Sequence, residues 1–255
     1  MLATRFPSTS KPFEIPEPRE SGGTGTVAIT FALPEESQDL VPKLTDVRYI
    51  RRGRLPMIEG KLHGTSVVIC HTGVGEESCR AQMAEFLQLA QPEWLLSSGF
   101  AGGLDPALKV GDVIVARNFS DERLLARTGV MEAATGILTT QPEVAETVAG
   151  KSALAASTHA AAVDMETAII AQVCAERVIP MLSLRGISDA AGDDLPVPFS
   201  KWFDSSRQQP RVAALLMELA LHPFKIPAFV GFVKGISRTR LQLTEVLAAV
   251  IGAAG

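Results

Sequence analysis

The sequence predicts an α/β fold: a single-domain three-layer αβα sandwich with a mostly parallel or mixed central sheet. Apolar strand-like runs alternate with helical segments along residues 26–187, which is typical of a sheet covered by helices on both faces. The composition, 46% hydrophobic with only 5% aromatic residues, suits a large aliphatic core. No internal repeat interrupts the pattern, so residues 26–255 are expected to form one domain, including a helical C-terminal region at 205–255.

The first predicted strand, residues 26–33 (TVAITFAL), runs directly into a helix. Pro34 stands in the first helical turn, where its missing N–H is tolerated. Glu35 and Glu36 follow, and acidic residues are favoured beside the positive end of a helix. These carboxylates are therefore expected at the carboxyl end of a buried strand.

The other strands and helices continue the alternation. Residues 65–75 form a strand that runs into glycines, and the helix after it has apolar residues at spacings of three and four. Residues 93–104 (EWLLSSGFAGGL) form a buried strand with a glycine-rich end. The remaining predicted elements are a strand over 111–119, a helix over 141–157, a short strand over 160–165, a helix over 166–178 and a strand over 179–187.

The C-terminal region is predicted to be helical and broken by Pro223 and Pro227. Its last helix has an apolar face made by Phe229, Phe232, Val233 and Ile236. Lys234 and Arg238 point the other way. We expect this helix to pack on its own sheet or on a second subunit, and the alternative is peripheral contact with a membrane.

Charge and cysteine content exclude several classes of protein. The net charge of −4 gives no basic face for a nucleic acid. The three cysteines are at positions 70, 79 and 174, with no CxxC, so neither a disulfide framework nor a zinc site is expected. Residues 1–25 are polar and proline-rich and predict a flexible tail without a signal-peptide core. We therefore expect a cytoplasmic protein.

Four polar elements fall at the carboxyl ends of the predicted strands, the edge at which such sheets bind ligands. They are Glu35–Glu36, the glycine loop 99–103, Met165–Glu166 and Ser188–Asp189. The glycines lack the full GxGxxG pattern and mark either tight turns or close approach of a ligand to the backbone. Glu166 and Asp189, taken singly, are explained as acids at helix starts. With Glu36 they form a carboxylate set of the kind that cleaves a glycosidic bond.

Four separated segments resemble the nucleoside phosphorylase superfamily, and within it the methylthioadenosine/S-adenosylhomocysteine nucleosidase branch. They are ALPEE, HTGVGEESCRAQM, SSGFAGGLDPALKVGDVIVA and VDMETAIIAQVCAERVIPMLSLRGISDAAGDD, in the family's order. The ending RVAALLMELALHPFKIPAFVGFVKGISRTR looks similar to hopanoid-biosynthesis-associated members, which act on adenosylhopane. The resemblance implies a nucleoside phosphorylase-like fold, a homodimer, and no metal or organic cofactor.

The resemblance also implies a role for each candidate residue. Asp189 would be the general acid that protonates the purine at N7, with Ser188 positioning it. Glu166 would bind the ribose hydroxyls, Met165 would lie against the sugar, and Glu36 would activate the attacking water. The sugar and base would be lined by Phe100, Ala101 and Gly102.

These roles require the two catalytic acids to differ in protonation. An apolar strand end should keep Asp189 protonated, so that the purine can leave as a neutral base. Glu36, nearer to solvent and to a helix start, should stay ionised as a base.

Departures from the family pattern leave open the identity of the nucleophile and of the purine base in the substrate. No arginine precedes the glycine loop and Phe100 stands within it, which favours water over phosphate. The basic cluster at 47–54 (VRYIRRGR) could still supply phosphate ligands, although solvated surface is the simpler interpretation. No purine-contacting aromatic segment is recognisable within 119–162. The alternatives are a phosphate-dependent nucleoside phosphorylase and a non-catalytic nucleoside-binding protein.

Overall fold

A computed structural model describes residues 25–130, 134–204 and 209–254. Apart from its last residue, the predicted tail at 1–25 lies outside the described residues. The helices are α1 (Pro34–Ser37), α2 (Glu76–Ala90), α3 (Glu122–Thr128), α4 (Val148–Thr158), α5 (Thr167–Glu176), α6 (Phe199–Trp202), α7 (Val212–Leu221) and α8 (Ile226–Ala254). Short 3-10 turns are η1 (Val41–Lys43), η2 (Arg117–Phe119) and η4 (Pro223–Lys225).

The described strands form one large sheet and a separate two-stranded ribbon. The large sheet contains β1 (Val27–Phe31), β2 (Thr45–Arg52), β3 (Leu55–Leu62), β4 (Thr65–His71), β5 (Trp94–Gly103), β6 (Val113–Ala116), β7 (Ala134–Gly136), β8 (Leu138–Thr140), β9 (Ala162–Asp164) and β10 (Met181–Asp189). Its main path runs β2-β3-β4-β1-β5-β10-β6-β7. The ribbon pairs β11 (Phe203–Asp204) with β12 (Gln209–Pro210).

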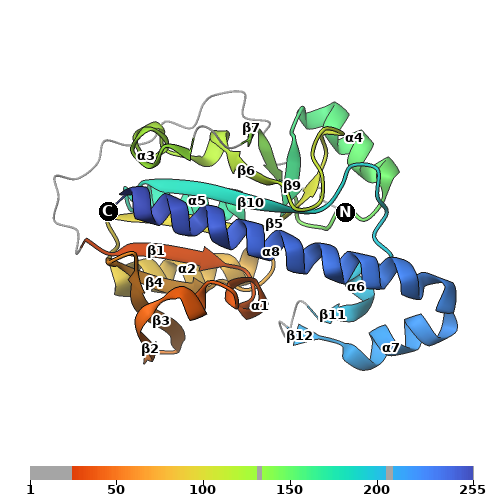
Figure 1. Ribbon diagram of the computed structural model, residues 1–255, viewed down its shortest axis with the longest axis horizontal. Helices are drawn as coiled ribbons and strands as arrows, with labels where there is room; N and C mark the ends of the chain where they lie inside the picture. The colour runs from red at the N-terminus through yellow and green to blue at the C-terminus, as the bar shows by residue number, and fades with distance from the viewer. Residues whose placement is uncertain (1–24, 131–133, 205–208, 255) are drawn as a thin grey trace, which may run out of the picture.

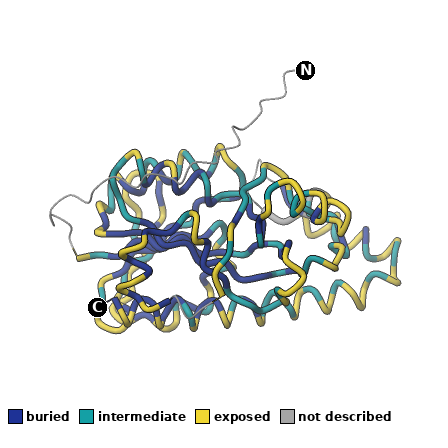
Figure 2. Tube along the Cα trace, turned by 90° about the horizontal axis from the view of Figure 1, so that it is seen from above, coloured by how far each residue is buried: buried dark blue, intermediate teal, exposed yellow. Residues whose placement is uncertain are grey.

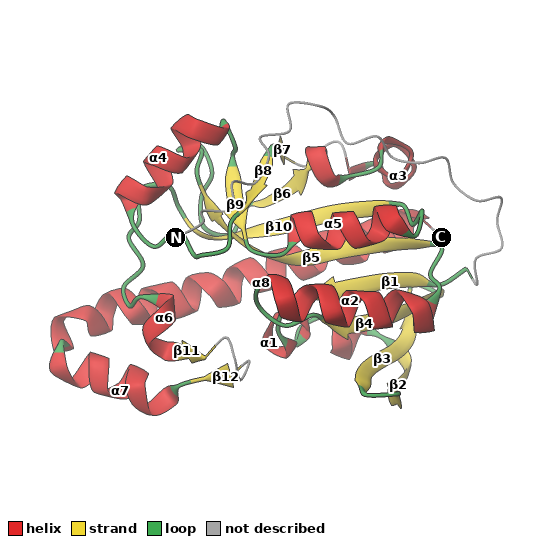
Figure 3. Cartoon of the chain, turned by 180° about the vertical axis from the view of Figure 1, so that it is seen from behind, coloured by secondary structure: helices red, strands yellow, loops and turns green. Residues whose placement is uncertain are grey.

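The four central strands are parallel, and helices cover both of their faces. β1 pairs with β4 and β5, and β10 pairs with β5, all in parallel. Helix α8 packs on one face with Val27, Ile29 and Leu96. Helices α2 and α5 pack on the other face with Leu95 and Met181 (Figure 1, Figure 3). The predicted three-layer α/β sandwich with a mixed sheet is confirmed.

The contact between α8 and β10 depends on a glycine. A Cβ on Gly186 would lie 2.6 Å from the Cγ2 of Thr239, so any larger residue would push the helix away from the strand. The hydroxyl of Thr239 donates to the carbonyl of Ile187 at 3.0 Å. These contacts fix α8 close to the strand that ends at Asp189.

The β2–β3 hairpin was not predicted as a pair of strands. It forms the edge of the sheet and contains the basic cluster at 47–54. Arg48 and Arg52 both pair with Glu59 on β3, at 3.0 and 2.8 Å. Charged side chains are common on edge strands because they discourage pairing with another chain. The charged residues of β2 interrupt the alternation of apolar and polar residues by which a strand is predicted.

Only the second half of α8 packs on the sheet. The face predicted to pack there (Phe229, Phe232, Val233 and Ile236) lies in the first half, where Val233 is 45% exposed. The buried residues of the helix run from Thr239 to Ala254, whereas much of the helix before Thr239 is exposed (Figure 2). Among the described residues no single helix is long and apolar enough to cross a membrane. Helix α7 and residues Pro223–Ala254 pass that test only together, with a bend of 107° between them.

Candidate active site

The carboxyl ends of β5 and β10 form the floor of the candidate site. The two strands run parallel until Ala101 and Ile187, and Ser188 is then an extra residue, so that Asp189 pairs with Gly102. A β-bulge of this kind re-aims the side chains next to it. A Cβ on Gly102 would lie 3.2 Å from Oδ2 of Asp189. The glycine therefore lets the carboxylate rest directly on the strand backbone.

Glu36 lies over the same strand. It is in the single turn of α1, and its Oε2 accepts hydrogen bonds from the N–H of Ala32 at 2.8 Å and Leu33 at 3.4 Å. A Cβ on Gly99 would lie 3.5 Å from this oxygen. The glycine loop predicted to admit a ligand thus lies beneath two carboxylates from distant parts of the chain.

Glu166 comes to this edge from the start of α5. Its Oε1 accepts a hydrogen bond from the N–H of Gly75, in the turn between β4 and α2, at 3.0 Å. Burial, followed by the negative charge of Asp164, raises the pKa of Glu166 to about 8, and the charge of Glu36 adds to the effect. Glu36 and Glu166 are therefore near enough to influence each other's protonation.

The expectation that Glu36 stays ionised near solvent is wrong. Burial raises its pKa to about 7, although the N–H of Ala32 and the positive charge of Arg185 act in the opposite direction. Helix α1 is only one turn long, so it does not carry the carboxylate out into water. A carboxylate with a pKa near 7 is suited to accept a proton at neutral pH.

Asp189 was expected to have apolar surroundings, but it forms an ion pair with Lys151. The ammonium is fully buried on α4 and also donates to the carbonyls of Ala190 and Asp193, both at 2.8 Å. The hydroxyl of Ser188 donates to Oδ1 of Asp189 at 2.6 Å. Both carboxylate oxygens thus accept from a donor.

Sequence reasoning missed Lys151 as a site residue. It lies in the alanine-rich segment GKSALAAS, where a lysine ordinarily stays in solvent. Its position on α4 is fixed at the start of the helix, where the Thr147 side chain accepts from the N–H of Gly150 at 3.1 Å. Only the sheet topology brings this face of α4 to Asp189.

Arg185 was also missed, although it belongs to the family-like segment that ends in SLRGISDAAGDD. It is buried on β10, and its Nε donates to Oδ2 of Asp164 at 3.0 Å. Its other four donors bind the carbonyl of Ser97 (2.9 Å), the carbonyl of Leu184 (2.7 Å), the hydroxyl of Ser97 (2.8 Å) and the hydroxyl of Thr167 (2.6 Å). All five N–H groups of the guanidinium are therefore used within the protein.

The remaining predicted residues lie at the same edge. Met165 and Phe100 are partly buried, and Ala101 is buried. The hydroxyl of Ser188 also contacts the carbonyl of Ala101 at 3.3 Å, which ties the two strand ends together. Within the described part of the chain, no group of three or more His, Cys, Asp or Glu side chains is arranged to hold a metal ion.

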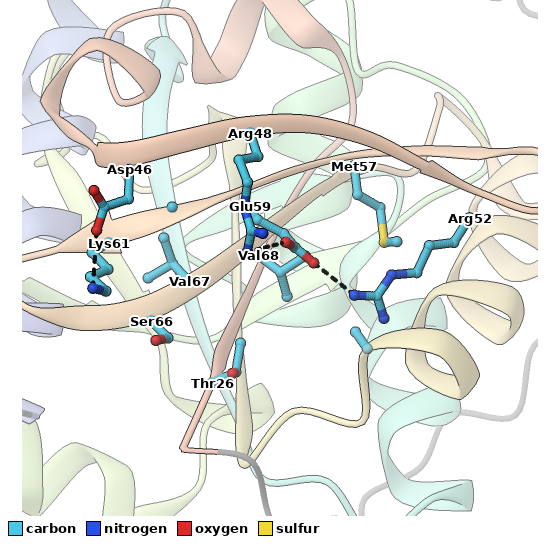
Figure 4. A pocket seen from close by; sticks show the side chains of 12 residues that line it. Thr26, Asp46, Arg48, Arg52, Met57, Glu59, Lys61, Ser66, Val67 and Val68 are labelled. Atoms are coloured by element: carbon cyan, nitrogen blue, oxygen red, sulfur yellow. Dashed lines mark hydrogen bonds and ion pairs between the residues drawn. The ribbon is translucent and has the colours of Figure 1, made fainter.

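The basic cluster does not contribute to this edge. A polar pocket beside it is bounded by Thr26, which precedes β1, and by Ala90, which ends α2 (Figure 4). Arg48, Arg52 and Glu59 point into it. These boundaries place the pocket at the amino-terminal end of β1, whereas the acids lie at the carboxyl ends of the strands.

A family model described as the Phosphorylase superfamily matches residues 26–130 and 121–220. The chain belongs to the phosphorylase superfamily. The prediction of an enzyme of the nucleosidase or nucleoside phosphorylase kind is thereby confirmed.

Two relatives of this superfamily member are 5'-methylthioadenosine/S-adenosylhomocysteine nucleosidases. The protein from Colwellia psychrerythraea is 27% identical over 220 residues, which cover 70% of this chain and 89% of the relative. The protein from Geobacillus thermodenitrificans is 25% identical over 228 residues, covering 74% of this chain and 94% of the relative.

Solved structures agree with the superfamily fold. The Colwellia psychrerythraea nucleosidase in complex with adenine has a TM-score of 0.68 at 22% identity, covering 90% of this chain and 95% of that chain. A futalosine hydrolase mutant from Helicobacter pylori has a TM-score of 0.58 at 22% identity, covering 65% and 89%.

Proposed function

We propose that the chain is a purine nucleosidase that hydrolyses the N-glycosidic bond of an adenine nucleoside and releases adenine. The observation that carries this proposal is the gathering of Glu36, Glu166 and Asp189 around the glycine-rich end of β5. The likeness to nucleosidases, one of them solved with adenine, supports the choice of base.

The leaving purine needs a proton because it departs poorly as an anion. We assign its delivery to N7 to Asp189, with Ser188 as the positioning residue. Both oxygens of Asp189 accept hydrogen bonds, from Ser188 and from Lys151, so we assign the source of the proton to a neighbour. Lys151 is the adjoining proton-bearing group, and transfer from its ammonium through Asp189 to N7 leaves a neutral lysine and a protonated base.

The attacking water needs a base, and Glu36 has the matching pKa. The water oxygen bonds to C1′ as the bond from C1′ to N9 breaks, and Glu36 takes the proton that the water loses. Burial, which raises the pKa of Glu36 to about 7, makes it a stronger base than an exposed carboxylate.

The sugar is assigned to Glu166 and Met165, and the loop Phe100–Ala101–Gly102 is assigned to the sugar and base. A carboxylate that binds ribose hydroxyls stabilises the oxocarbenium-like transition state more than the ground state, which accelerates the reaction. Substrate hydroxyls would supply hydrogen bonds to Glu166 beyond the one from Gly75.

Water is favoured over phosphate because the arginine nearest the site and two arginines of the basic cluster are engaged within the protein. All five donors of Arg185 are used internally, and Arg48 and Arg52 pair with Glu59. Phosphorolysis remains the second candidate, because a neighbouring subunit could supply an arginine.

For the remaining features we propose a cytoplasmic homodimer whose residues 26–255 form one catalytic domain. By resemblance to the hopanoid-associated members, the 5′ substituent is an apolar group and adenosylhopane is the candidate substrate. Such a substrate calls for contact with a membrane, and the C-terminal helix is the segment proposed for it.

The test is adenine release measured chromatographically, with methylthioadenosine, S-adenosylhomocysteine and a 5′-alkyl adenosine as substrates in phosphate-free buffer. We expect hydrolysis, fastest for the alkyl compound. Strict dependence on added phosphate would establish the phosphorylase instead. No turnover of any substrate, combined with tight adenine binding, would favour the non-catalytic alternative.

A further inference from the structure

Helix α7, the turn η4 and the first part of α8 form an arm that projects beyond the sheet (Figure 1, Figure 3). We define the arm as residues 212–238. Gly235 and Arg238 still contact Val110 and Gly111, in the connection between β5 and β6. The part of α8 before Gly235 continues roughly 12 Å further at 1.5 Å per residue. Because Thr239 rests on the end of β10, the arm projects from the edge of the sheet at which Asp189 lies.

The arm carries most of the large apolar side chains that are exposed in the described residues. They are Val212, Leu216, Met217, Leu221, Phe224, Ile226, Val230 and Val233, with exposed fractions from 43% for Ile226 to 75% for Phe224. Eight exposed apolar side chains within 22 residues indicate an interaction site, since soluble chains rarely leave so many uncovered together.

The arm is also positively charged within an acidic protein. It has three basic residues, Lys225, Lys234 and Arg238, and one acidic residue, Glu218, whereas the whole chain has a net charge of −4. Glu218 is neutralised by Lys225 at 3.0 Å and by Lys201 at 3.1 Å. The arm therefore combines exposed apolar side chains with two further exposed cations, Lys234 and Arg238.

We propose that this arm docks on the surface of an anionic lipid bilayer, with the turn from Leu221 to Phe224 inserted among the headgroups. Apolar residues flanked by lysines are the combination that interfacial helices use on anionic membranes. The bend of 107° between α7 and the following helix suits an arm that lies on the surface. A second copy of the chain fits less well, because a symmetric contact would bring like charges together.

This inference deepens the membrane contact in the proposed function by naming the residues that make it, and its test is independent of the hydrolysis. The arm would bind lipid whatever reaction takes place at Asp189. If the hydrolysis proposal also holds, the arm would bring the carboxylate edge close to the bilayer, where apolar substrates are concentrated.

The test is flotation of the full chain with vesicles of phosphatidylcholine, with and without phosphatidylglycerol. We expect binding to the anionic vesicles that weakens with salt. Phe224→Glu should reduce the bound fraction about tenfold or more, because it removes an aromatic ring that the bilayer would bury and adds a negative charge. Tyr49→Glu is the matched control: Tyr49 is 74% exposed but lies on β2, so this variant should bind as the original chain does.

Two further measurements complete the test. Circular dichroism should show that both variants are folded, and Lys234→Glu should weaken binding while Lys109→Glu should not. The proposal is overturned if the original chain ignores anionic vesicles or if Phe224→Glu binds them equally well. It is also overturned if Phe224→Glu instead lowers the molecular mass in lipid-free buffer, since the arm would then join two copies of the chain.

Discussion

The ammonium of Lys151 and the carboxylate of Asp189 form a buried ion pair at the end of β10. The same ammonium holds the carbonyls of Ala190 and Asp193. Lys151 therefore fixes the carboxylate of Asp189 and the loop that follows it. Removing one partner of a buried pair leaves the other charge uncompensated, at a cost of about 3 to 5 kcal/mol.

Lys151→Met should lower both stability and turnover. The melting temperature should fall because Asp189 is left without its cation, and kcat should fall about 100-fold or more because the proton source is lost. Lys151→Arg is the control, since it restores the charge but not a readily donated proton. If Lys151→Arg recovers stability and also full kcat with an unchanged pH profile, the role of Lys151 is purely structural.

Asp189→Asn should abolish most turnover with little change in binding. Asparagine occupies the same space but cannot pass a proton to N7, so kcat should fall about 10²- to 10⁴-fold. Calorimetric titration with adenine should show a dissociation constant within a small factor of the original. An equal loss of affinity and turnover would mean that Asp189 binds the base without acting as an acid.

Glu36→Gln should remove the acidic limb of the pH profile. The pKa of Glu36 is raised to about 7, so kcat/KM of the original enzyme should rise as the pH increases through 7 and the carboxylate ionises. The variant should retain only a low rate without that limb. If the rise in kcat/KM near pH 7 persists in Glu36→Gln, the titrating group is another residue.

Folding stability should fall as the pH rises from about 5 to 9. An ordinary carboxyl group titrates near about 4.3, whereas in the folded chain burial raises the pKa of Glu36 to about 7 and that of Glu166 to about 8. Between these values the folded state binds more protons than the unfolded state, so deprotonation favours unfolding. Urea denaturation across this range should show the decline, and Glu166→Gln should flatten its upper part. A stability that rises over the same range would contradict the assigned shifts.

Gly102→Ala should impair catalysis more than folding. The added Cβ would lie 3.2 Å from Oδ2 of Asp189 and would displace the carboxylate, so we expect a fall in kcat of about tenfold for a shift of a few tenths of an ångström. Gly192→Ala is the matched control, because a Cβ there meets no atom within 4 Å. Equal kcat values for the two variants would contradict a role of Asp189 in the reaction.

Sequence reasoning succeeded for features that depend on residues close together in the chain. Continuous apolar runs identified the central strands, and the acids after them were correctly expected at the carboxyl ends of those strands. It failed where an environment depends on distant residues. The pKa of Glu36 depends on burial around a single helical turn, and the partner of Asp189 comes from α4. The β2–β3 hairpin was hidden because its charged residues suit an edge strand and leave no apolar alternation.

The unbroken length of α8 links two ends of the molecule that would otherwise be independent. One end of this helix belongs to the exposed arm. In its middle, Thr239 packs against Gly186, which is three residues before Asp189 on β10. A helix is stiff, and Gly186 leaves no space at its contact with Thr239. A tilt of the arm would therefore press Thr239 against β10. We therefore expect binding at the arm to shift the end of β10 that carries Asp189.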